Sequence, residues 1–172
     1  MIILALDLST KDSGYAIYRG QELIHHGHIT AGSSNLFHRI HHMVEELAKV
    51  IKEYKPEKAI IEDVLPEDVR HNTQVFKALT YLQGFICDLL DSNKIEYKFF
   101  TASEWRKKCG IHTGRGIKRE SLKTADVAFV QNQFGIKVGD DEADAIGIGF
   151  AAVGGTLKDP QVVTDEFGFE FA

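Results

Sequence analysis

The stretch that decides the fold is IILALD, residues 2–7, in which five apolar residues are followed by the acid Asp7. An uninterrupted apolar run bounded by a turn-forming stretch, STKDSG at residues 9–14, is typical of a buried β-strand. A second run, AIIE at residues 59–62, also ends in an acid, Glu62. Because an acid at the end of a buried strand lowers stability unless it is paired or binds a cation, the two runs predict a functional site.

The periodicity of apolar residues predicts five strands and five helices. The strands are expected at residues 2–8, 14–18, 22–29, 58–64 and 95–99. The helices are expected at residues 35–54, 72–91, 118–134 and 140–155, with a short helix that is capped by Thr101 or Ser103 and ends at Lys108. Strands joined by short turns favour an antiparallel meander, whereas strands that alternate with helices favour parallel pairing. The sequence therefore predicts an α/β fold with a five-stranded mixed sheet and helices on both faces, in the element order of the ribonuclease H-like fold.

Length and composition predict one globular domain and a distinct tail. The chain has 172 residues, of which 44% are apolar and 26% charged, as is ordinary for a soluble protein with a substantial core. It has no run of about 18 apolar residues and no basic N-terminal segment, so we expect no membrane span and no signal peptide. Cys87 and Cys109 belong to no motif, which predicts reduced cysteines and a cytoplasmic location. We expect the domain to span residues 1–158 and an acidic, aromatic tail to span residues 159–172.

The charge of the chain is unevenly distributed. The formal net charge is −5, but the tail contributes four acids and no base, so residues 1–158 carry only −1. Residues 104–123 carry seven bases against two acids, a local charge of +5. The bases are Arg106, Lys107, Lys108, Arg115, Lys118, Arg119 and Lys123. Such a segment suits a phosphate backbone, although a solvated helix surface can have the same composition.

Further acids open the last predicted helix, in the stretch GDDEADAI at residues 139–146. Asp141 and Asp144 are three residues apart and share a helix face, and Asp140, four residues before Asp144, is an alternative to Asp141. Acids at a helix N-terminus also interact favourably with the macrodipole, which is a simpler explanation for the cluster. That explanation fits Asp144 less well, because small apolar residues surround it.

Together, these acids have the composition of a metal centre. The candidate ligands are Asp7, Glu62, Asp141 and Asp144. Carboxylate oxygens suit Mg²⁺ or Mn²⁺, and clustered acids repel one another unless cations are bound. Two metal ions about 4 Å apart would activate a water and stabilise the leaving oxygen in phosphodiester hydrolysis. The acids thus predict a nuclease with two Mg²⁺ ions per site, for which Mn²⁺ can substitute.

Several motifs resemble those of the RuvC family of Holliday-junction resolvases. They are Asp7 within LALDLST, Gly14, Glu62 at the end of its strand, DEADA at residues 141–145, and Asn72 followed by Gly84. TASEWR at residues 101–106 is similar to the family stretch Pro-(Ser/Ala)-x-x-(Val/Trp)-(Lys/Arg), and GRGIK at residues 114–118 is similar to its glycine pair followed by lysine. The resemblance covers residues 2–155, and its specificity comes from the order and spacing of the motifs.

The resemblance implies an activity and assigns roles to the matching residues. It implies a metal-dependent endonuclease that cuts four-way DNA junctions by paired symmetric nicks, leaving 5′-phosphate and 3′-hydroxyl ends. The catalytic, metal-binding acids would be Asp7, Glu62, Asp141 and Asp144, with Lys118 near the scissile phosphate. DNA contacts are expected from Asn72, Arg106, Lys107, Lys108, Arg115, Lys118 and Arg119. The implied partners are branched DNA, a second copy of the chain in a two-fold homodimer, and branch-migration machinery.

The chain also departs from the family pattern. Thr101 stands where the family usually has proline, and DVLP at residues 63–66 stands where the family often has an aromatic wedge. A longer loop at residues 67–71 follows. These departures suit a phage or Gram-positive variant that accepts several branched DNAs besides the four-way junction.

Four further features have more than one explanation. Six of the eight histidines lie between His25 and His42, and we expect hydrogen-bonded or solvated rings rather than a zinc site, because no cysteine accompanies them. Trp105 is expected to anchor its helix by packing rather than to contact a base. The helix at residues 72–91 is expected to form either a dimer surface or core. The tail is expected to be mobile or an edge strand, with docking to a partner or competition with DNA as alternatives.

Other functions are compatible with parts of the same pattern. A nuclease of the same fold acting on structured RNA would need the same acids, and a protein that only binds branched DNA would need none of them. Actin-like ATPases and sugar kinases also have a first strand that ends in Asp, but they need a second domain that 172 residues do not provide. The complete set of four acids favours a nuclease.

Overall fold

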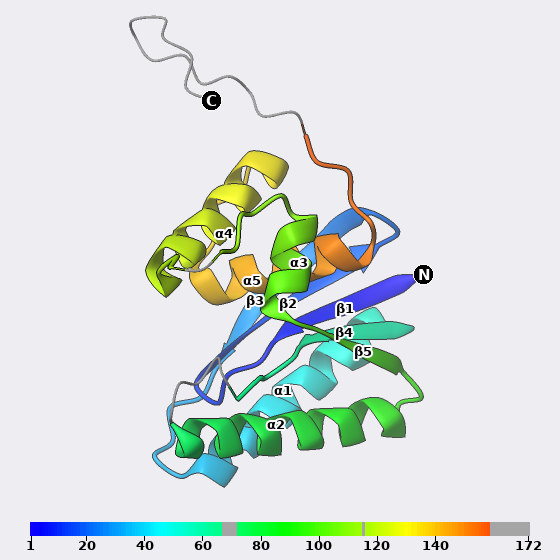
Figure 1. The fold of residues 1–172 in the computed structure, drawn as a ribbon. Helices are drawn as coiled ribbons and strands as arrows, with labels where there is room; N and C mark the ends of the chain where they lie inside the picture. Colours follow the sequence, from blue (N-terminus) through cyan, green and yellow to red (C-terminus); the bar gives the residue numbers. More distant parts are fainter. Residues whose placement is uncertain (67–71, 115, 159–172) are drawn as a thin grey trace, which may run out of the picture.

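The computed structural model describes residues 1–66, 72–114 and 116–158, and five strands in these ranges form one sheet in the order β3-β2-β1-β4-β5 (Figure 1). The strands are β1 (Ile2–Asp7), β2 (Asp12–Arg19), β3 (Glu22–Thr30), β4 (Lys58–Glu62) and β5 (Glu96–Phe100). The first three pair antiparallel, whereas β1 with β4 and β4 with β5 pair parallel. The predicted mixed sheet, with an antiparallel meander at one side, is therefore confirmed.

The register of the central strand sets up the functional edge of the sheet. Leu6 of β1 pairs with Ile61 of β4, and Asp7 pairs with Gly14 of β2. Parallel neighbours have their carboxyl ends at the same edge of a sheet. Asp7 and Glu62 are the last residues of their strands, so both acids lie at that edge.

Two helices, α1 (Leu36–Tyr54) and α2 (Thr73–Ser92), cover one face of the sheet and lie below it in Figure 1. Side chains alternate between the faces of a strand, so Leu4 and Leu6 point into this layer while Ile3 and Ala5 point into the other. Buried partners from the two helices complete this core, among them Met43, Leu47, Leu82, Ile86 and Leu90. Each large aliphatic side chain buried here stabilises the fold by about 1.5–3 kcal/mol.

Three helices, α3 (Ala102–Lys108), α4 (Arg119–Phe134) and α5 (Asp140–Ala152), cover the opposite face (Figure 1). α5 lies directly on the sheet and is built mainly from small apolar residues. A Cβ at Gly149 would lie 2.3 Å from the ring of Tyr18, and one at Gly147 would lie 2.6 Å from the ring of Trp105. Glycine at these two positions thus lets α5 pack against β2 and α3.

The end of α5 differs from its predicted position. The helix ends at Ala152 rather than at residue 155. Gly154 adopts a left-handed φ of 64°, and the amide nitrogen of Gly155 donates to the carbonyl of Phe150 at 3.0 Å. A left-handed glycine with such a back-bond is a common helix terminator, so the apolar periodicity continued past the true end.

The start of α3 decides between the two caps that the sequence left open. The hydroxyl of Thr101 accepts from the amide of Glu104, and the Glu104 carboxylate accepts from the amide of Thr101. This reciprocal capping box satisfies two backbone donors at the helix start. Thr101, rather than Ser103, is therefore the cap, and it fixes α3 beside the acid-bearing edge.

Two further expectations concern the whole chain. Cys87 and Cys109 are both free thiols, which agrees with the predicted absence of a disulfide between them. None of the helices in the described ranges combines the length and the apolarity of a membrane span. The predicted tail, residues 159–172, lies outside the described residues, so the domain boundary stays a prediction.

Candidate metal centre

The two strand-end acids meet the first turns of α5. Asp7 and Glu62 end β1 and β4, and Asp141 and Asp144 follow the N-terminus of α5 at Asp140. The four side chains come from positions up to 137 residues apart in the chain, 144 less 7. The fold thus gathers the four predicted acids at one edge of the sheet.

The meeting of β2 and α5 depends on Gly14. A Cβ at this residue would lie 1.8 Å from the carbonyl oxygen of Asp141, so only glycine fits without moving the helix. Gly14 pairs with Asp7 across the β1–β2 ladder. The absence of a side chain at Gly14 therefore places the first turn of α5 next to Asp7.

The electrostatics of the acids confirm that they lie close together. The pKa of Asp7 is raised well above its usual range, first by burial and then by the charges of Glu62 and Asp141. Burial, followed by the charge of Asp7, raises the pKa of Asp144 to about 9. Such shifts are those of carboxyl groups that share one site without a cation. A bound divalent cation would remove the repulsion and favour the ionised acids.

Asp144 has a further property that suits a metal ligand. It is only 5% exposed, and its Oδ1 atom is buried without a hydrogen-bond partner among the described residues. Its other carboxylate oxygen lies 3.8 Å from Nη2 of Arg106. A buried carboxylate oxygen without a partner is unfavourable unless it receives a proton, a water or a cation. The donor set therefore fits a hard divalent cation.

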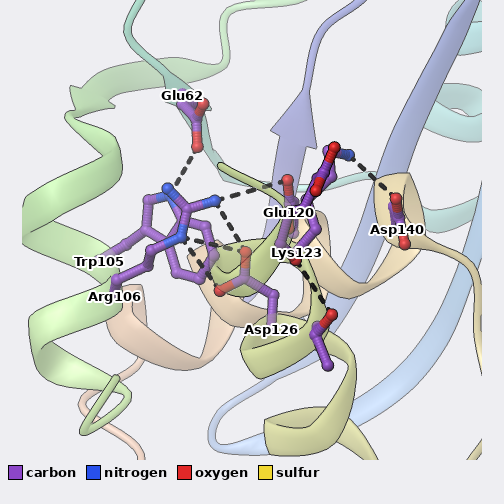
Figure 2. A network of polar contacts seen from close by, with 9 residues as sticks. Glu62, Trp105, Arg106, Glu120, Lys123, Asp126 and Asp140 are labelled. Carbon is purple, nitrogen blue, oxygen red and sulfur yellow. Dashed lines mark hydrogen bonds and ion pairs between the residues drawn. The ribbon is translucent and has the colours of Figure 1, made fainter. Parts of the chain in front are cut away.

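The acids lie near one another, but their side chains are not arranged to ligate a metal ion. Across residues 1–66, 72–114 and 116–158, no three His, Cys, Asp or Glu side chains are spaced to enclose a metal ion. In Figure 2 one carboxylate oxygen of Glu62 faces the indole nitrogen of Trp105. Metal ligation would need the carboxylates to come closer together than they are here.

The neighbours of Asp140 and Asp141 separate these two alternatives. Asp140 is exposed and lies 3.4 Å from the ammonium of Lys123. Asp141 is half-buried, burial raises its pKa, and its charge acts on Asp7. Asp141 therefore remains the better candidate ligand, and Asp140 is better explained as the partner of Lys123.

Trp105 contacts the candidate centre in a way that the sequence did not indicate. The ring is completely buried, so its predicted role as a packing anchor is confirmed. Its indole nitrogen also donates to Oε2 of Glu62 at 2.6 Å. No short-range pattern signals this bond, because 43 residues separate the donor from the acceptor.

Arg106 differs from its expected role as a phosphate contact. Its side chain is buried, and its guanidinium donates three hydrogen bonds to Asp126, from Nε at 3.0 Å and 3.1 Å and from Nη2 at 2.8 Å (Figure 2). Because the guanidinium is already paired in the interior, we correct its assignment to a structural ion pair beside Asp144. Asp126 itself was missed, although TADVA around it has the same apolar setting as EADAI around Asp144.

The other bases of the basic segment divide into exposed and paired residues. Lys107, Lys108, Lys118 and Arg119 are exposed, while Lys123 is paired with Asp140. The ammonium of Lys108 lies 4.7 Å from the ring centre of Phe100. Arg115 lies outside the described residues. The positive surface on this side thus rests on four exposed side chains from α3 and the start of α4.

Asn72 has a role that the sequence did not assign to it. It precedes the first residue of α2, and its Oδ1 accepts from the amide of Val75 at 3.1 Å. The residue is therefore the N-cap of α2, and a contact to DNA would come in addition to this structural role.

The histidines of β3 are hydrogen-bonded, as predicted. Nδ1 of His26 and Nδ1 of His28 lie 3.1 Å and 2.8 Å from the two carboxylate oxygens of Glu142. The hydrogen bond to Glu142 is the main cause that raises the pKa of His28. These contacts join β3 to the first turn of α5, next to Asp141.

The outer surface of α1 and α2 carries exposed aromatic rings. Phe37 stacks on Tyr81 with ring centres 6.0 Å apart, and His41 packs edge-on against Phe85 at 5.7 Å. Phe37 is 48% exposed, Tyr81 46% and Phe85 39%. On another side of α2, Leu82 and Ile86 are fully buried in the core. One side of α2 is thus core, and another side is an exposed surface that a partner could cover.

The sheet order, the helices on both faces and the acids at one edge define a ribonuclease H-like α/β protein with a carboxylate site. The family model described as "Crossover junction endodeoxyribonuclease RuvC" matches residues 3–151. The chain therefore belongs to the RuvC family.

Curated relatives and solved structures agree with this family and fold. Proteins named crossover junction endodeoxyribonuclease RuvC from Rickettsia rickettsii and Rickettsia bellii are each 25% identical over 158 residues, which are 89% of this chain and 97% of theirs. The structure is similar to Thermus thermophilus RuvC in complex with Holliday junction substrate, with a TM-score of 0.72, 12% identity, and coverage of 89% and 94%. It is also similar to a Fowlpox virus resolvase with Holliday junction DNA, with a TM-score of 0.58, 15% identity, and coverage of 89% and 97%.

Proposed function

We propose that this protein is a metal-dependent, structure-selective endonuclease that resolves four-way DNA junctions by paired symmetric cleavage. The observation that carries the proposal is the cluster of mutually repelling acids at the end of the sheet, in a chain of the RuvC family. A divalent metal follows from the family and from the donor set. Two Mg²⁺ ions per site, replaceable by Mn²⁺, are the finer part of the proposal.

The proposed ligands are Asp7, Glu62, Asp141 and Asp144. When bound, the metal ions would supply an activated water and charge stabilisation for hydrolysis of the phosphodiester. The chain holds the ligands on two adjacent strand ends and one helix, which fixes their relative positions better than loops would. Lys118, exposed just before α4, is proposed to hold the scissile phosphate.

The DNA backbone is proposed to lie along the basic surface of α3 and the start of α4. The exposed bases there are Lys107, Lys108, Lys118 and Arg119. Contacts from lysine and arginine to phosphates position a nucleic acid without reading its sequence. This is what a nuclease selective for structure needs. Arg115 and Asn72 remain proposed contacts, and Arg106 does not, because it is buried.

A homodimer is proposed because a four-way junction carries two strands to be cut symmetrically. Two-fold dimers bury the same patch of each subunit. The exposed rings of Phe37, His41, Tyr81 and Phe85 on α1 and α2 are the proposed patch. Exposed aromatic clusters of this kind favour interfaces, since they bury a large apolar area at low entropic cost.

The test compares labelled substrates with Mg²⁺ and with EDTA. A mobile four-way junction, a replication fork, plain duplex and a structured RNA are incubated with the wild type, with Asp7→Asn and with Asp88→Asn. Asp88 lies exposed on α2, so its variant is a matched control that makes the same chemical change away from the acids.

We expect metal-dependent paired nicks in the junction that vanish in Asp7→Asn and persist in Asp88→Asn. Binding of the junction by Asp7→Asn should persist, because the phosphate contacts are unchanged. Fork cleavage at a similar rate would broaden the substrate to branched DNA. Cleavage of the RNA alone, or binding without any cleavage, would contradict the proposal in favour of the corresponding alternative.

A further inference from the structure

Trp105 is the only tryptophan of the chain, and its N–H group points at a candidate metal ligand. The indole is completely buried, and its nitrogen donates to Oε2 of Glu62 at 2.6 Å (Figure 2). An indole N–H is a donor only, and when buried it needs an acceptor. In this interior the acceptor is the acid that ends β4.

The helix that carries the ring is capped, and two neighbours lie against the ring itself. Its helix is fixed by the capping box between Thr101 and Glu104. Beneath it, a Cβ at Gly147 would lie 2.6 Å from Cζ3 of the ring, so α5 leaves just enough room for the indole. The guanidinium of Arg106 lies 4.5 Å from the ring centre. These contacts fix the ring in its place and so contribute to the direction of its N–H group.

Two consecutive residues of α3 reach two different acids of the centre. Trp105 bonds Glu62 on β4, while the guanidinium of Arg106 lies 3.8 Å from Asp144 on α5. Arg106 is in turn held by Asp126 of α4. A short helix thus connects the strand side of the centre to its helix side.

We propose that Trp105 is a positioning residue for the metal centre: its indole N–H holds one oxygen of Glu62 so that the carboxylate is oriented for metal ligation. This inference rests on the proposed metal centre and adds a residue of this chain to it. A carboxylate can accept a hydrogen bond on one oxygen and ligate a metal with the other. Hydrogen bonds from the surrounding shell to ligating groups typically change metal affinity by about 10- to 100-fold when they are removed.

A positioning role and a packing role of Trp105 predict different effects on metal binding. If the ring only filled space, its truncation would lower the stability of the fold without a specific change in metal affinity. A ring bonded to a ligand must respond to the metal, because a cation on Glu62 withdraws electron density from the oxygen that accepts the N–H. Since the chain has one tryptophan, tryptophan emission comes from this indole alone.

The first experiment titrates Mg²⁺ into the full-length wild type without DNA and records tryptophan emission. We expect a saturable change in emission that disappears in Asp7→Asn, in which Trp105 and Glu62 are intact but a proposed ligand is lost. A flat response in the wild type under conditions where metal binding is demonstrated independently would overturn the proposal.

The second experiment measures free Mn²⁺ by electron paramagnetic resonance, which does not depend on the tryptophan. Trp105→Phe removes the N–H and keeps an aromatic ring. Cys109→Ala is the matched control, because Cys109 is buried just after the same helix and contacts Gly147 rather than an acid. We expect Trp105→Phe to bind Mn²⁺ about 10- to 100-fold more weakly than the wild type and Cys109→Ala to bind it within about 2-fold.

The outcomes separate this inference from the proposed function. If the wild type binds Mn²⁺ and both variants weaken binding to the same extent, Trp105 acts through packing and only the positioning role fails. If Trp105→Phe binds like the wild type, the role also fails while junction cleavage stands. If the wild type binds no Mn²⁺ at all, both the proposed metal centre and the positioning role are contradicted. Circular dichroism of each variant shows whether the fold is retained.

Discussion

The face of the sheet under α1 and α2 buries aliphatic side chains, whereas the face under α3, α4 and α5 also buries charged ones. The first core contains leucines, isoleucines, two alanines, a methionine and a valine, and none of the charged residues that are buried in the described part of the chain belongs to it. On the other face Arg106, Asp126 and Asp144 are each at least 91% buried. The first face stabilises the fold by burial alone. The second depends on charge pairing, so stability and function compete there and not on the first face.

The largest effect is expected from breaking the buried ion pair on the functional face. Asp126→Ala should lower the free energy of unfolding by about 3–5 kcal/mol, because it leaves the guanidinium of Arg106 buried without its partner. Denaturant unfolding followed by circular dichroism measures the loss. Metal affinity should fall as well, since the freed guanidinium lies 3.8 Å from Asp144 and would pair with it.

A matched change on the aliphatic face sharpens this comparison. Leu82→Ala, at a fully buried position of α2, should destabilise by about 2–5 kcal/mol through lost packing. Its metal affinity should stay at the wild-type value. If Leu82→Ala weakened metal binding as much as Asp126→Ala does, the two faces would not be functionally separable.

The second effect is a gain in stability when the carboxyl group of Asp144, a proposed metal ligand, is replaced. The pKa of Asp144 is raised to about 9, chiefly by burial and then by Asp7, so the folded protein keeps a proton that the unfolded chain releases near pH 4. The stability of the metal-free protein should therefore fall as the pH rises from about 4 to about 9. Asp144→Asn should stabilise it by about 1–2 kcal/mol at pH 8 in EDTA and flatten this dependence, while abolishing cleavage.

Thermal unfolding at pH 5 and pH 8 in EDTA measures both parts of that expectation. Asp88→Asn, an exposed change of the same chemistry, should stay within about 0.5 kcal/mol of the wild type at both values. A wild type that is equally stable at the two pH values, with Asp144→Asn no more stable, would show that the acids on this face do not oppose folding.

The third effect concerns the outside of the aliphatic layer. Phe85→Glu places a charge on the exposed aromatic patch and should convert a dimer to monomers while changing the stability of the subunit by only about 0.5 kcal/mol. Light scattering after size-exclusion chromatography gives the mass. Paired nicks in the junction should become unpaired single nicks. An unchanged dimer mass would place the interface elsewhere.

The smallest effect is expected from one exposed base on the functional face. Lys107→Ala should reduce the slope of the logarithm of junction affinity against the logarithm of salt concentration by about 1, as the loss of one phosphate contact does. Lys52→Ala, an exposed lysine near the end of α1, is the control and should leave the slope unchanged. Equal slopes for the wild type and Lys107→Ala would remove this residue from the DNA path.

The sheet could be predicted from sequence because its strands are short apolar runs with clear turns between them. The strand-end acids could be predicted for the same reason, since the ends of β1 and β4 are marked by Asp7 and Glu62 within the apolar runs themselves. Parallel pairing then brings the two together without any knowledge of side-chain contacts. The positions of Asp141 and Asp144 followed from helical spacing in one stretch.

The contacts between the helices of the functional face could not be predicted in that way. Arg106 and Lys107 are neighbours in one basic run and look alike in sequence, yet Arg106 is buried and Lys107 is exposed. A count of charges along the chain does not tell which side of a short helix faces the core. The partner of Arg106 lies 20 residues away on another helix, and the acceptor of the Trp105 indole is 43 residues away.

Gly14 offers a way to separate binding of a junction from its cleavage with a very small change. A single methyl group there would collide with the carbonyl oxygen of Asp141 and would push the start of α5 away from β2. No charge would be added or removed, and the exposed lysines of α3 would stay where they are. Gly14→Ala is thus a route to a catalytically silent junction-binding reagent that keeps all four acids. A chemist who wants to trap branched DNA intact would start at this position rather than at the acids themselves.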